Sequence, residues 1–463
     1  MACILARAVY VLLLSGVCSS QAKWFTDLLS SSRLTVANLL TENGKGNVLV
    51  VEFRFVDDHQ GLLIHERVLR GNARDVAVVG RSSAVDGMFL DRGSASDYDA
   101  WEQLGNPGWG WSSLLPYFKK VSVTSTPPLA SLFREKEGAN GKAFGVFWVP
   151  SPLDLMTETR SYARTAHYYR AKSRSNNYHL FTGYTVIHIT FTGGLTANKE
   201  VILAAGVIGA PQILQRSGIG PKALLEKAGI KVKQGLPGVG RNFQDHPIIF
   251  LVNATFNSDA FTEYQKFKTS PYTMSQTNAI GFLSLKTVNP NYVSIISTLE
   301  SQDATSYLPK IYDQTLIASS LSQRSIVASQ GTVSINITDP FGDPTTDYGA
   351  FANLVEVANS IAMIKLLRKY YATPSTQTLG PVETFPGANI TSDADIENIL
   401  RTALVYPSFT HPSCTCAMLP LDRGGVVSPD LRVYGTSLLS VIPLIPTRHL
   451  QASVYAIAEK ICE

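Results

Sequence analysis

Cysteine is scarce in this chain, with only five among 463 residues. Cys3 and Cys18 lie in an apolar N-terminal run, so a processed chain would keep Cys414, Cys416 and Cys462. So few cysteines exclude a small scaffold held together by disulfides. The C-x-C pair has no nearby His or Cys cluster to complete a four-ligand zinc site. We expect this pair to be either packed in the core or disulfide-bonded.

Charge is also sparse, at 16% of residues, with a formal net charge of only +4. Lys and Arg are scattered, so the basic patch expected of a nucleic-acid-binding or membrane-surface protein is absent from the sequence. The length and the hydrophobic fraction of 45% exceed what a single core usually uses. Two intertwined domains and a small neutral partner are therefore expected.

No apolar run is long enough to span a bilayer comfortably. Residues 1–22 combine Arg7, a short apolar run and small residues near Ala22, which predicts a signal peptide. A buried strand or a short membrane anchor is the alternative. Three Asn-X-Thr sequons agree with secretion and are candidate glycosylation sites: Asn253, Asn336 and Asn389.

The glycine fingerprint of a dinucleotide fold is missing. Residues 34–53 predict a helix, a Gly/Asn turn and a strand that ends on the acid Glu52, where such folds bind ribose hydroxyls. Counting back, however, places Leu28, Ser30 and Arg33 where three glycines should allow phosphate to approach. On these residues alone, an ordinary helix–turn–strand is the favoured interpretation.

The rest of the chain predicts an α/β organisation. A turn and an amphipathic helix are expected over 105–120, and a strand, a glycine turn, a helix and a glycine stop over 197–221. Beyond about residue 250, alternating apolar residues predict a mostly antiparallel sheet. Helices are expected over 354–371 and over 392–403, the second with Ser392 as N-cap.

Three long motifs then occur in order: residues 81–111, residues 200–221 and GVGRNFQDHP at 238–247. HPSCTCAM, DRGGVVSPDLRVYG and PLIPTRHLQASVYAIAEK follow towards the C-terminus. From about Leu34 onwards the chain resembles the glucose-methanol-choline flavoproteins. The HPSCTCAM and HLQAS variants, the signal and the sequons are most similar to fungal secreted members, including those of polyketide tailoring pathways.

The resemblance implies an α/β (α+β overall) fold, in which an incomplete Rossmann-like FAD-binding domain is interleaved with a substrate domain built on a mostly antiparallel sheet with helices. The implied boundaries are 23–250 with 405–463 for the first domain and 251–404 for the second. His411 matches the family's catalytic base, and His449 matches the residue that hydrogen-bonds the substrate oxygen. A histidine suits proton abstraction because its ordinary pKa, about 6.5, lies near working pH. His246, in the QDHP stretch, is interpreted as a loop anchor at least as readily.

FAD is the implied cofactor. The positions that the resemblance assigns to it are Glu52 for the ribose, Val186 beside the adenine, Gln451 near the ring, and a turn near the flavin formed by Asp86, Gly87, Met88 and Phe89. Asp86 replaces the family's usual Asn, and its negative charge would oppose a reduced flavin unless neutralised. The stretch between Glu52 and Arg81 is short, Arg81 replaces a glycine, and the family's VVDAS segment is lacking.

Three functions are therefore open. The first is a FAD-dependent alcohol oxidase or dehydrogenase acting on a small-molecule alcohol in fungal secondary metabolism, with O2 or a quinone-like electron acceptor. The second is a non-redox lyase or cyclase that keeps flavin as structure. The third is a catalytically impaired remnant lacking the phosphate turn. Neither nucleic acid nor a stable membrane span is expected.

Overall fold

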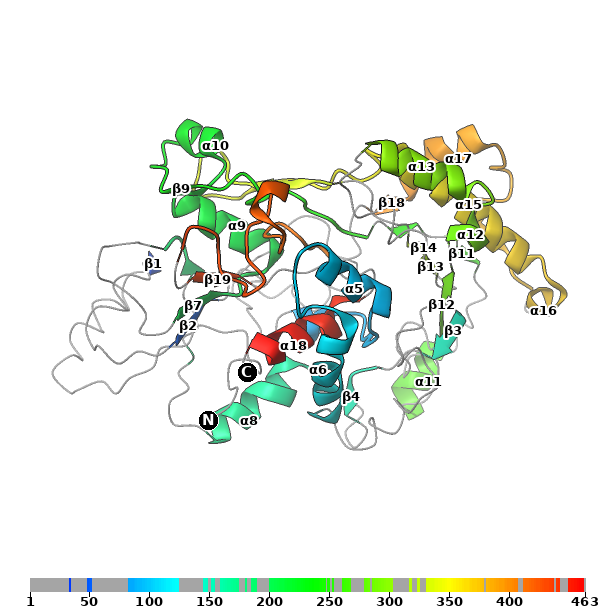
Figure 1. The fold of residues 1–463 in the computed structure, drawn as a ribbon. Coiled ribbons are helices and arrows are strands. Elements are labelled where there is room, and N and C mark those ends of the chain that lie inside the picture. Colours follow the sequence, from blue (N-terminus) through cyan, green and yellow to red (C-terminus); the bar gives the residue numbers. More distant parts are fainter. Residues whose placement is uncertain are drawn as a thin grey trace.

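A computed structural model describes a large part of the chain (Figure 1). Residues 1–22 and Glu52 lie outside the described residues. The described residues are 33–34, 48–51, 82–124, 145–148, 151–154, 159–174, 180, 185–189, 200–246, 248–249, 252–253, 260–267, 279–283, 285–302, 316–318, 323–324, 330–378, 380–406, 411–436, 439–441 and 449–461.

A three-stranded parallel sheet lies near one end of the molecule. Its order is β19 (Leu439–Val441), β7 (Glu200–Leu203) and β2 (Val48–Val51). The central strand is buried, which agrees with its nearly continuous apolar sequence. The stretch that lacks the family's VVDAS segment thus still contributes a strand, β19. A second parallel pair joins β1 (Arg33–Leu34) to β6 (Thr185–Val186).

The first residue of the helix predicted from residue 34 is therefore in a strand, which corrects that boundary. Leu34 pairs with Val186, because pairing with a buried strand outweighs a weak local helix preference. The rest of that predicted helix lies outside the described residues. The strand predicted before Glu52 is confirmed as β2.

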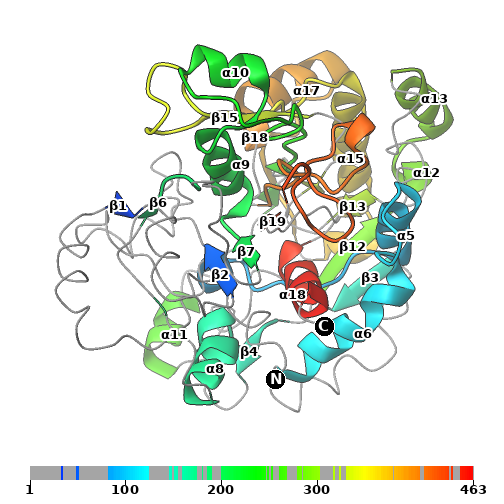
Figure 2. The ribbon, with the colours of Figure 1, turned by 60° about the vertical axis from the view of Figure 1, so that its left-hand side comes forward.

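Helices surround the parallel sheet and share one core. α9 (Gly206–Arg216) follows β7, and α6 (Trp111–Thr124) packs along α18 (Leu450–Ile461), as both views show (Figures 1 and 2). A 2.7 Å ion pair between Lys120 and Glu459 joins these two helices. The core cluster includes Tyr98, Leu114, Leu203, Ile213, Leu214, Val239, Val426, Val433 and Ala456. The C-terminal helix is thus fastened to the N-terminal half of the chain.

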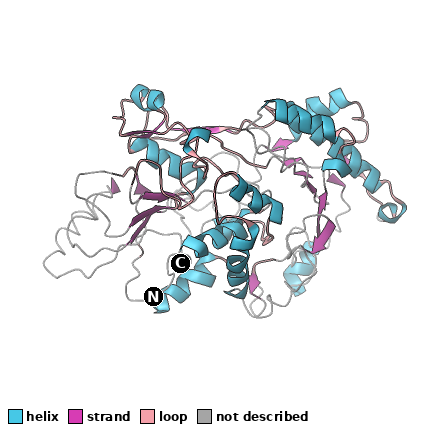
Figure 3. Ribbon diagram, viewed as in Figure 1, coloured by secondary structure: helices cyan, strands magenta, loops and turns pink. Residues whose placement is uncertain are grey.

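A six-stranded sheet with antiparallel pairing occupies the other side of the molecule, in a row beneath a group of helices (Figure 3). Its order is β18 (Val405–Tyr406), β10 (Ile248–Ile249), β14 (Gln323–Arg324), β13 (Leu316–Ala318), β12 (Ala279–Leu283) and β3 (Gly145–Trp148). This confirms the predicted combination of a Rossmann-like domain with an antiparallel sheet.

The helices above this sheet form as the sequence predicts. α15 (Leu354–Tyr371) spans the predicted segment, and α17 (Asp393–Ile399) begins after Ser392, whose hydroxyl accepts from the Asp395 N–H at 3.1 Å. A second, smaller core joins them through Val357, Ile364, Leu367, Ile396 and Leu400.

The predicted domain boundaries stay a proposal. β3, β10 and β18 come from segments assigned to the FAD-binding domain, yet they pair within the six-stranded sheet. Segments assigned to the FAD-binding domain therefore contribute strands to the six-stranded sheet at 145–148, 248–249 and 405–406.

The described residues contain further helices and strands. They are α4 (Ser82–Val85), α5 (Ala95–Gln103), β4 (Leu153–Asp154), β5 (Thr159–Arg160), η4 (Arg164–Tyr168), α8 (Tyr169–Arg174), β8 (Ile219–Gly220), α10 (Lys222–Lys227), β9 (Gln234–Gly235), β11 (Val252–Asn253), α11 (Ala260–Phe267), α12 (Leu285–Val288), α13 (Tyr292–Gln302), β15 (Thr332–Ser334), β16 (Thr345–Asp347), α16 (Pro374–Gln377), β17 (Glu383–Phe385), η6 (Leu400–Leu404) and η7 (Leu421–Arg423). Across the described residues, no helix has the length and apolar character needed to cross a membrane.

Candidate active site

His449 lies directly before α18 and is held on two sides. Its ring stacks on Phe89 with centroids 4.4 Å apart and planes at 5°. Its Nδ1 lies 2.7 Å from Oδ1 of Asp91, and the two side chains are only 6% and 9% exposed. Phe89 and Asp91 belong to the extended segment between α4 and α5. A buried carboxylate and an aromatic face thus fix the position and the rotation of this imidazole.

The structure brings His411 against His449, as the family resemblance predicts. Their ring centroids are 5.1 Å apart, and the planes cross at 83°. His246 completes the cluster, because its Nδ1 lies 3.2 Å from Nδ1 of His411. Three imidazoles from distant parts of the chain therefore meet at one place.

Backbone pairing explains why His246 and His411 meet. Gln244 and Ser413 form an antiparallel bridge in which each N–H donates to the other's carbonyl oxygen, at 3.1 and 2.8 Å. Two residues along each segment, the same register places His246 opposite His411. There the Asp245 carboxylate accepts from both backbone N–H groups, at 2.7 Å from His246 and 3.1 Å from His411. The Asp245 carboxylate thus takes the place of strand-to-strand hydrogen bonds and holds the backbone at both histidines.

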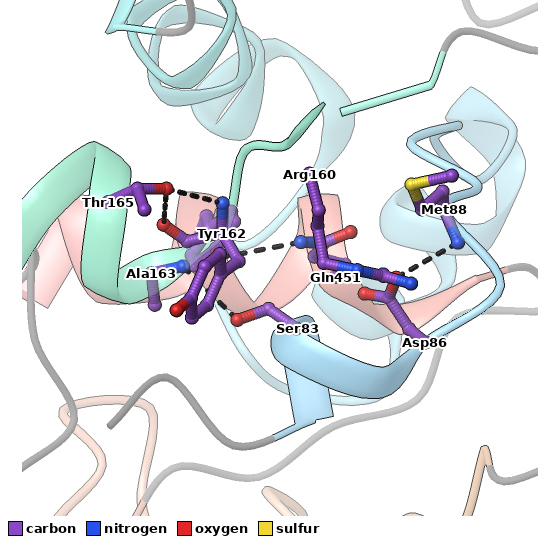
Figure 4. A network of polar contacts seen from close by, with 9 residues as sticks. Ser83, Asp86, Met88, Arg160, Tyr162, Ala163, Thr165 and Gln451 are labelled. Carbon is purple, nitrogen blue, oxygen red and sulfur yellow. Dashed lines mark hydrogen bonds and ion pairs between the residues drawn. The ribbon is translucent and has the colours of Figure 1, made fainter. Parts of the chain in front are cut away.

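The predicted flavin turn follows α4 (Figure 4). Met88 has a φ of 60°, in the left-handed region that side chains rarely adopt, and its N–H donates to Oδ1 of Asp86 at 2.9 Å. The same oxygen pairs with Nη1 of Arg160 at 2.5 Å. Burial raises the pKa of Asp86, although the Met88 hydrogen bond and Arg160 oppose that rise. Arg160 thus places a positive charge against the Asp86 carboxylate, which belongs to the predicted flavin turn.

Gln451 and Tyr455 occupy the first turns of α18, near this turn. The Gln451 Nε2 lies 3.5 Å from the Tyr455 hydroxyl. Its Oε1 is buried and has no hydrogen-bond partner among the described residues. Burial also raises the pKa of Tyr455, so this phenol stays protonated at neutral pH. An unsatisfied buried acceptor marks a place where a ligand with N–H donors would fit.

The residues assigned to FAD fit it on the flavin side. Gln451 offers a buried acceptor, and the Asp86–Arg160 pair is neutral in sum. Val186 is buried, with 3% exposed, in the predicted adenine region. On the phosphate side, Glu52 and residues 28–32 lie outside the described residues, and Arg33 is in β1 where a fingerprint glycine would stand.

Cys414 and Cys416 form no disulfide in the described part of the chain. Of the two expected alternatives, packing is thus the one observed. Both thiols are buried, and burial raises the pKa of Cys414 and raises that of Cys416 to about 12. Within the described residues, no group of three or more His, Cys, Asp or Glu side chains could hold a metal ion.

The asparagines of the three sequons have different structural surroundings. Asn389 is exposed, and the Asn336 Oδ1 accepts from the Thr338 N–H and hydroxyl at 2.9 and 2.7 Å. Asn253 lies in β11, opposite Glu383. Glycosylation at these positions stays a prediction.

Sequence reasoning missed Asp91 and Arg160, and it did not assign His246 to the site. Asp91 stands in the first motif without any special spacing, and Arg160 lies 74 residues from Asp86. No sequence pattern links Asp91 to His449 or Arg160 to Asp86. The paired H-P dipeptides at 246–247 and 411–412 were the available signal for His246.

The sequence matches family models and known proteins over most of its length. Two family models described as GMC oxidoreductase match, one over residues 68–179 and 188–248 and the other over 327–458. The chain is 31% identical to the dehydrogenase xptC of Emericella nidulans, over 93% of this chain and 90% of that protein. It is 30% identical to Mala s 12 of Malassezia sympodialis, over 82% and 78% of the two chains.

Solved structures show the same likeness. A FAD-dependent oxidoreductase from Chaetomium thermophilum has a TM-score of 0.73 at 31% identity, covering 83% of this chain and 85% of that one. A fungal aryl-alcohol oxidase has a TM-score of 0.70 at 29% identity, with the same coverage.

Proposed function

The chain belongs to the glucose-methanol-choline (GMC) oxidoreductase family, whose cofactor is FAD, and we propose that it oxidises a small-molecule alcohol. The observation that carries this proposal is the contact between His411 and the anchored ring of His449. Two imidazoles at right angles present two nitrogen atoms to one hydroxyl group.

We assign the substrate oxygen to His449 as hydrogen-bond partner. Its Nδ1 faces the Asp91 carboxylate, which only accepts hydrogen bonds when ionised, so Nδ1 carries a proton and donates it there. The Nε2 is then the atom left for the substrate oxygen. Stacking on Phe89 prevents the ring from turning away.

We assign proton abstraction to His411. A neutral imidazole is a suitable general base near neutral pH, and a positioned base contributes about 10²- to 10⁴-fold in rate. Bound FAD supplies the acceptor for the hydride that leaves the alcohol carbon. The residues proposed to hold it are Glu52, Val186, Gln451 and the turn of Asp86, Gly87, Met88 and Phe89.

Burial of Phe89 and of the whole His449 residue supports the proposed fixed position of the His449 ring. Phe89 and His449 are 7% and 5% exposed. The low local dielectric that burial creates strengthens the Asp91–His449 hydrogen bond.

The deciding experiment is flavin reduction without oxygen. We expect purified protein to show flavin absorbance that bleaches when a substrate alcohol, screened from aryl and alkyl alcohols, is added. His411→Gln and His449→Gln should retain the flavin and lose the bleaching by about 10²-fold or more. Folded protein that binds no flavin even after FAD is added would overturn the proposal.

Two other outcomes correspond to the alternative functions. Substrate turnover without bleaching would indicate a non-redox lyase or cyclase. A transcript that restores G-x-G-x-x-G and VVDAS would remove the remnant interpretation, since the sequence here lacks both.

The cellular setting is proposed from the sequence. Residues 1–22 and the sequons support secretion, and the HPSCTCAM and HLQAS variants support a role in fungal secondary metabolism. Reoxidising the reduced enzyme with O2 or with a quinone would identify the electron acceptor.

A further inference from the structure

His246 stands behind the proposed base rather than in an unrelated loop. The antiparallel bridge between Gln244 and Ser413 places His246 opposite His411. The Nδ1 atoms of the two histidines are 3.2 Å apart. His246 is 9% exposed, and Asp245 fixes the backbone on both sides. This contact is part of the fold, since it is built into two paired segments.

A contact between two Nδ1 atoms restricts where the protons lie. A hydrogen bond needs one donor and one acceptor, so one of the two nitrogens carries a proton and the other does not. If His411 donates, its proton is on Nδ1 and the neutral ring is unprotonated at Nε2. If His246 donates, a neutral His411 carries its proton on Nε2 and cannot act there as a base.

We propose that His246 is a positioning residue that accepts the Nδ1 proton of His411 and thereby keeps Nε2 of His411 ready to take the substrate proton. This inference rests on the proposed function, because it assigns the tautomer of the proposed base. His246 itself does not touch the substrate.

The same contact couples the protonation of the two rings. Two imidazolium ions would place N–H against N–H, so the pair accepts one extra proton readily and a second only by breaking the contact. The proton that His411 receives at Nε2 is stabilised because its Nδ1–H continues to donate to His246. Three further titratable groups lie close to the pair: Asp245 accepts from both backbone N–H groups, His449 contacts the His411 ring, and Asp91 pairs with His449.

The first test compares His246→Leu with His246→Asn. Leucine removes the acceptor, whereas the asparagine amide can present an oxygen near the position of Nδ1 but does not titrate in this range. We expect His246→Leu to lower kcat/KM by about 10- to 100-fold with bound flavin unchanged, and His246→Asn to restore most of it. The acid limb of the pH profile should move to lower pH in His246→Leu, because the protonated His411 loses the acceptor for its Nδ1–H, and it should move less in His246→Asn, whose amide oxygen accepts that hydrogen bond.

The second test reads the tautomer directly and needs no turnover. Histidine-selective ¹⁵N labelling, with His411→Gln to assign the signals, distinguishes protonated from unprotonated ring nitrogens among the eight histidines. We expect the wild-type His411 to be protonated at Nδ1 and not at Nε2 at the pH of maximal activity. A His411 protonated at Nε2 would overturn the inference, as would an unchanged pH profile in His246→Leu.

The two variants distinguish a failure of the proposed role of His246 from a failure of the proposed function. If His411→Gln remains fully active, the proposed base is wrong. If His411→Gln is inactive while His246→Leu keeps the wild-type rate and profile, only the role of His246 is wrong.

Discussion

Asp91 is the side chain on which the orientation of His449 depends. Replacing it with alanine removes the acceptor at 2.7 Å and leaves the Nδ1 proton of a buried imidazole without that partner. We expect Asp91→Ala to lower kcat on the order of a hundredfold, and Asp91→Asn, which keeps an acceptor oxygen, to lower it less. Steady-state kinetics separates this effect from a change in KM.

A matched control is Asp422→Ala, which removes an exposed carboxylate in the short η7 helix. Equal losses in Asp91→Ala and Asp422→Ala would show that Asp91 has no special role. A loss confined to KM would indicate that Asp91 shapes the pocket rather than the hydrogen bond to substrate.

Arg160 compensates a buried acid, so its removal should depend on pH. Because the pKa of Asp86 is raised above its ordinary 3.8 in the folded protein, protonation stabilises the fold, and stability falls as pH rises through that raised pKa. Arg160→Ala should destabilise by about 2 kcal/mol at pH 7, since it leaves the carboxylate without this cation. The penalty should shrink as pH falls towards 4.

Thermal unfolding of the wild type, Arg160→Ala and Asp86→Asn between pH 4 and 8 measures this. The Asp86→Asn variant, which has no charge to bury, serves as the reference and should lack the acid-range gain. A penalty for Arg160→Ala that is the same at every pH would contradict the assignment.

At the scale of elements, the GVGR loop depends on its glycines. Gly240 has a φ of 81°, donates to Thr415 O at 2.8 Å, and would press a Cβ against the Val333 carbonyl oxygen. Gly240→Ala should therefore cost roughly 3 kcal/mol. Gly235→Ala, in β9 with open space around a Cβ, is the matched control and should change stability little. Denaturant unfolding compares the two, and similar midpoints would refute the close approach.

Local signals explain which elements the sequence could predict. α15 and α17 formed as expected because apolar spacing and the Ser392 cap act over a few residues. The predicted helix boundary at Leu34 was wrong because a distant strand, β6, pairs there. For the same reason, motifs predicted His411 and His449, whereas the partners Asp91 and Arg160 became visible only in three dimensions.

At the scale of the whole molecule, FAD should be held less tightly than a complete fingerprint would allow. The sequence lacks the glycines that bring backbone N–H groups to the pyrophosphate. We expect purified protein to contain less than one flavin per chain and its Tm to rise as FAD is added. A ligand at about 100 times its Kd stabilises by about 2.7 kcal/mol.

A flavin titration followed by calorimetry measures this, with FMN as control because it lacks the adenosine half. A Tm that does not change with FAD in flavin-depleted protein would contradict the prediction. An equal response to FMN would show that the adenosine region around Val186 contributes nothing.

The histidine cluster is assembled from residues that are synthesised at very different times. Asp91 and His449 are 358 residues apart, and His246 and His411 are 165 apart. Synthesis proceeds from the N-terminus, so a nascent chain has its first motif long before it has His449 and α18. The α18 helix, which packs on α6 directly after His449, is itself complete only at residue 461.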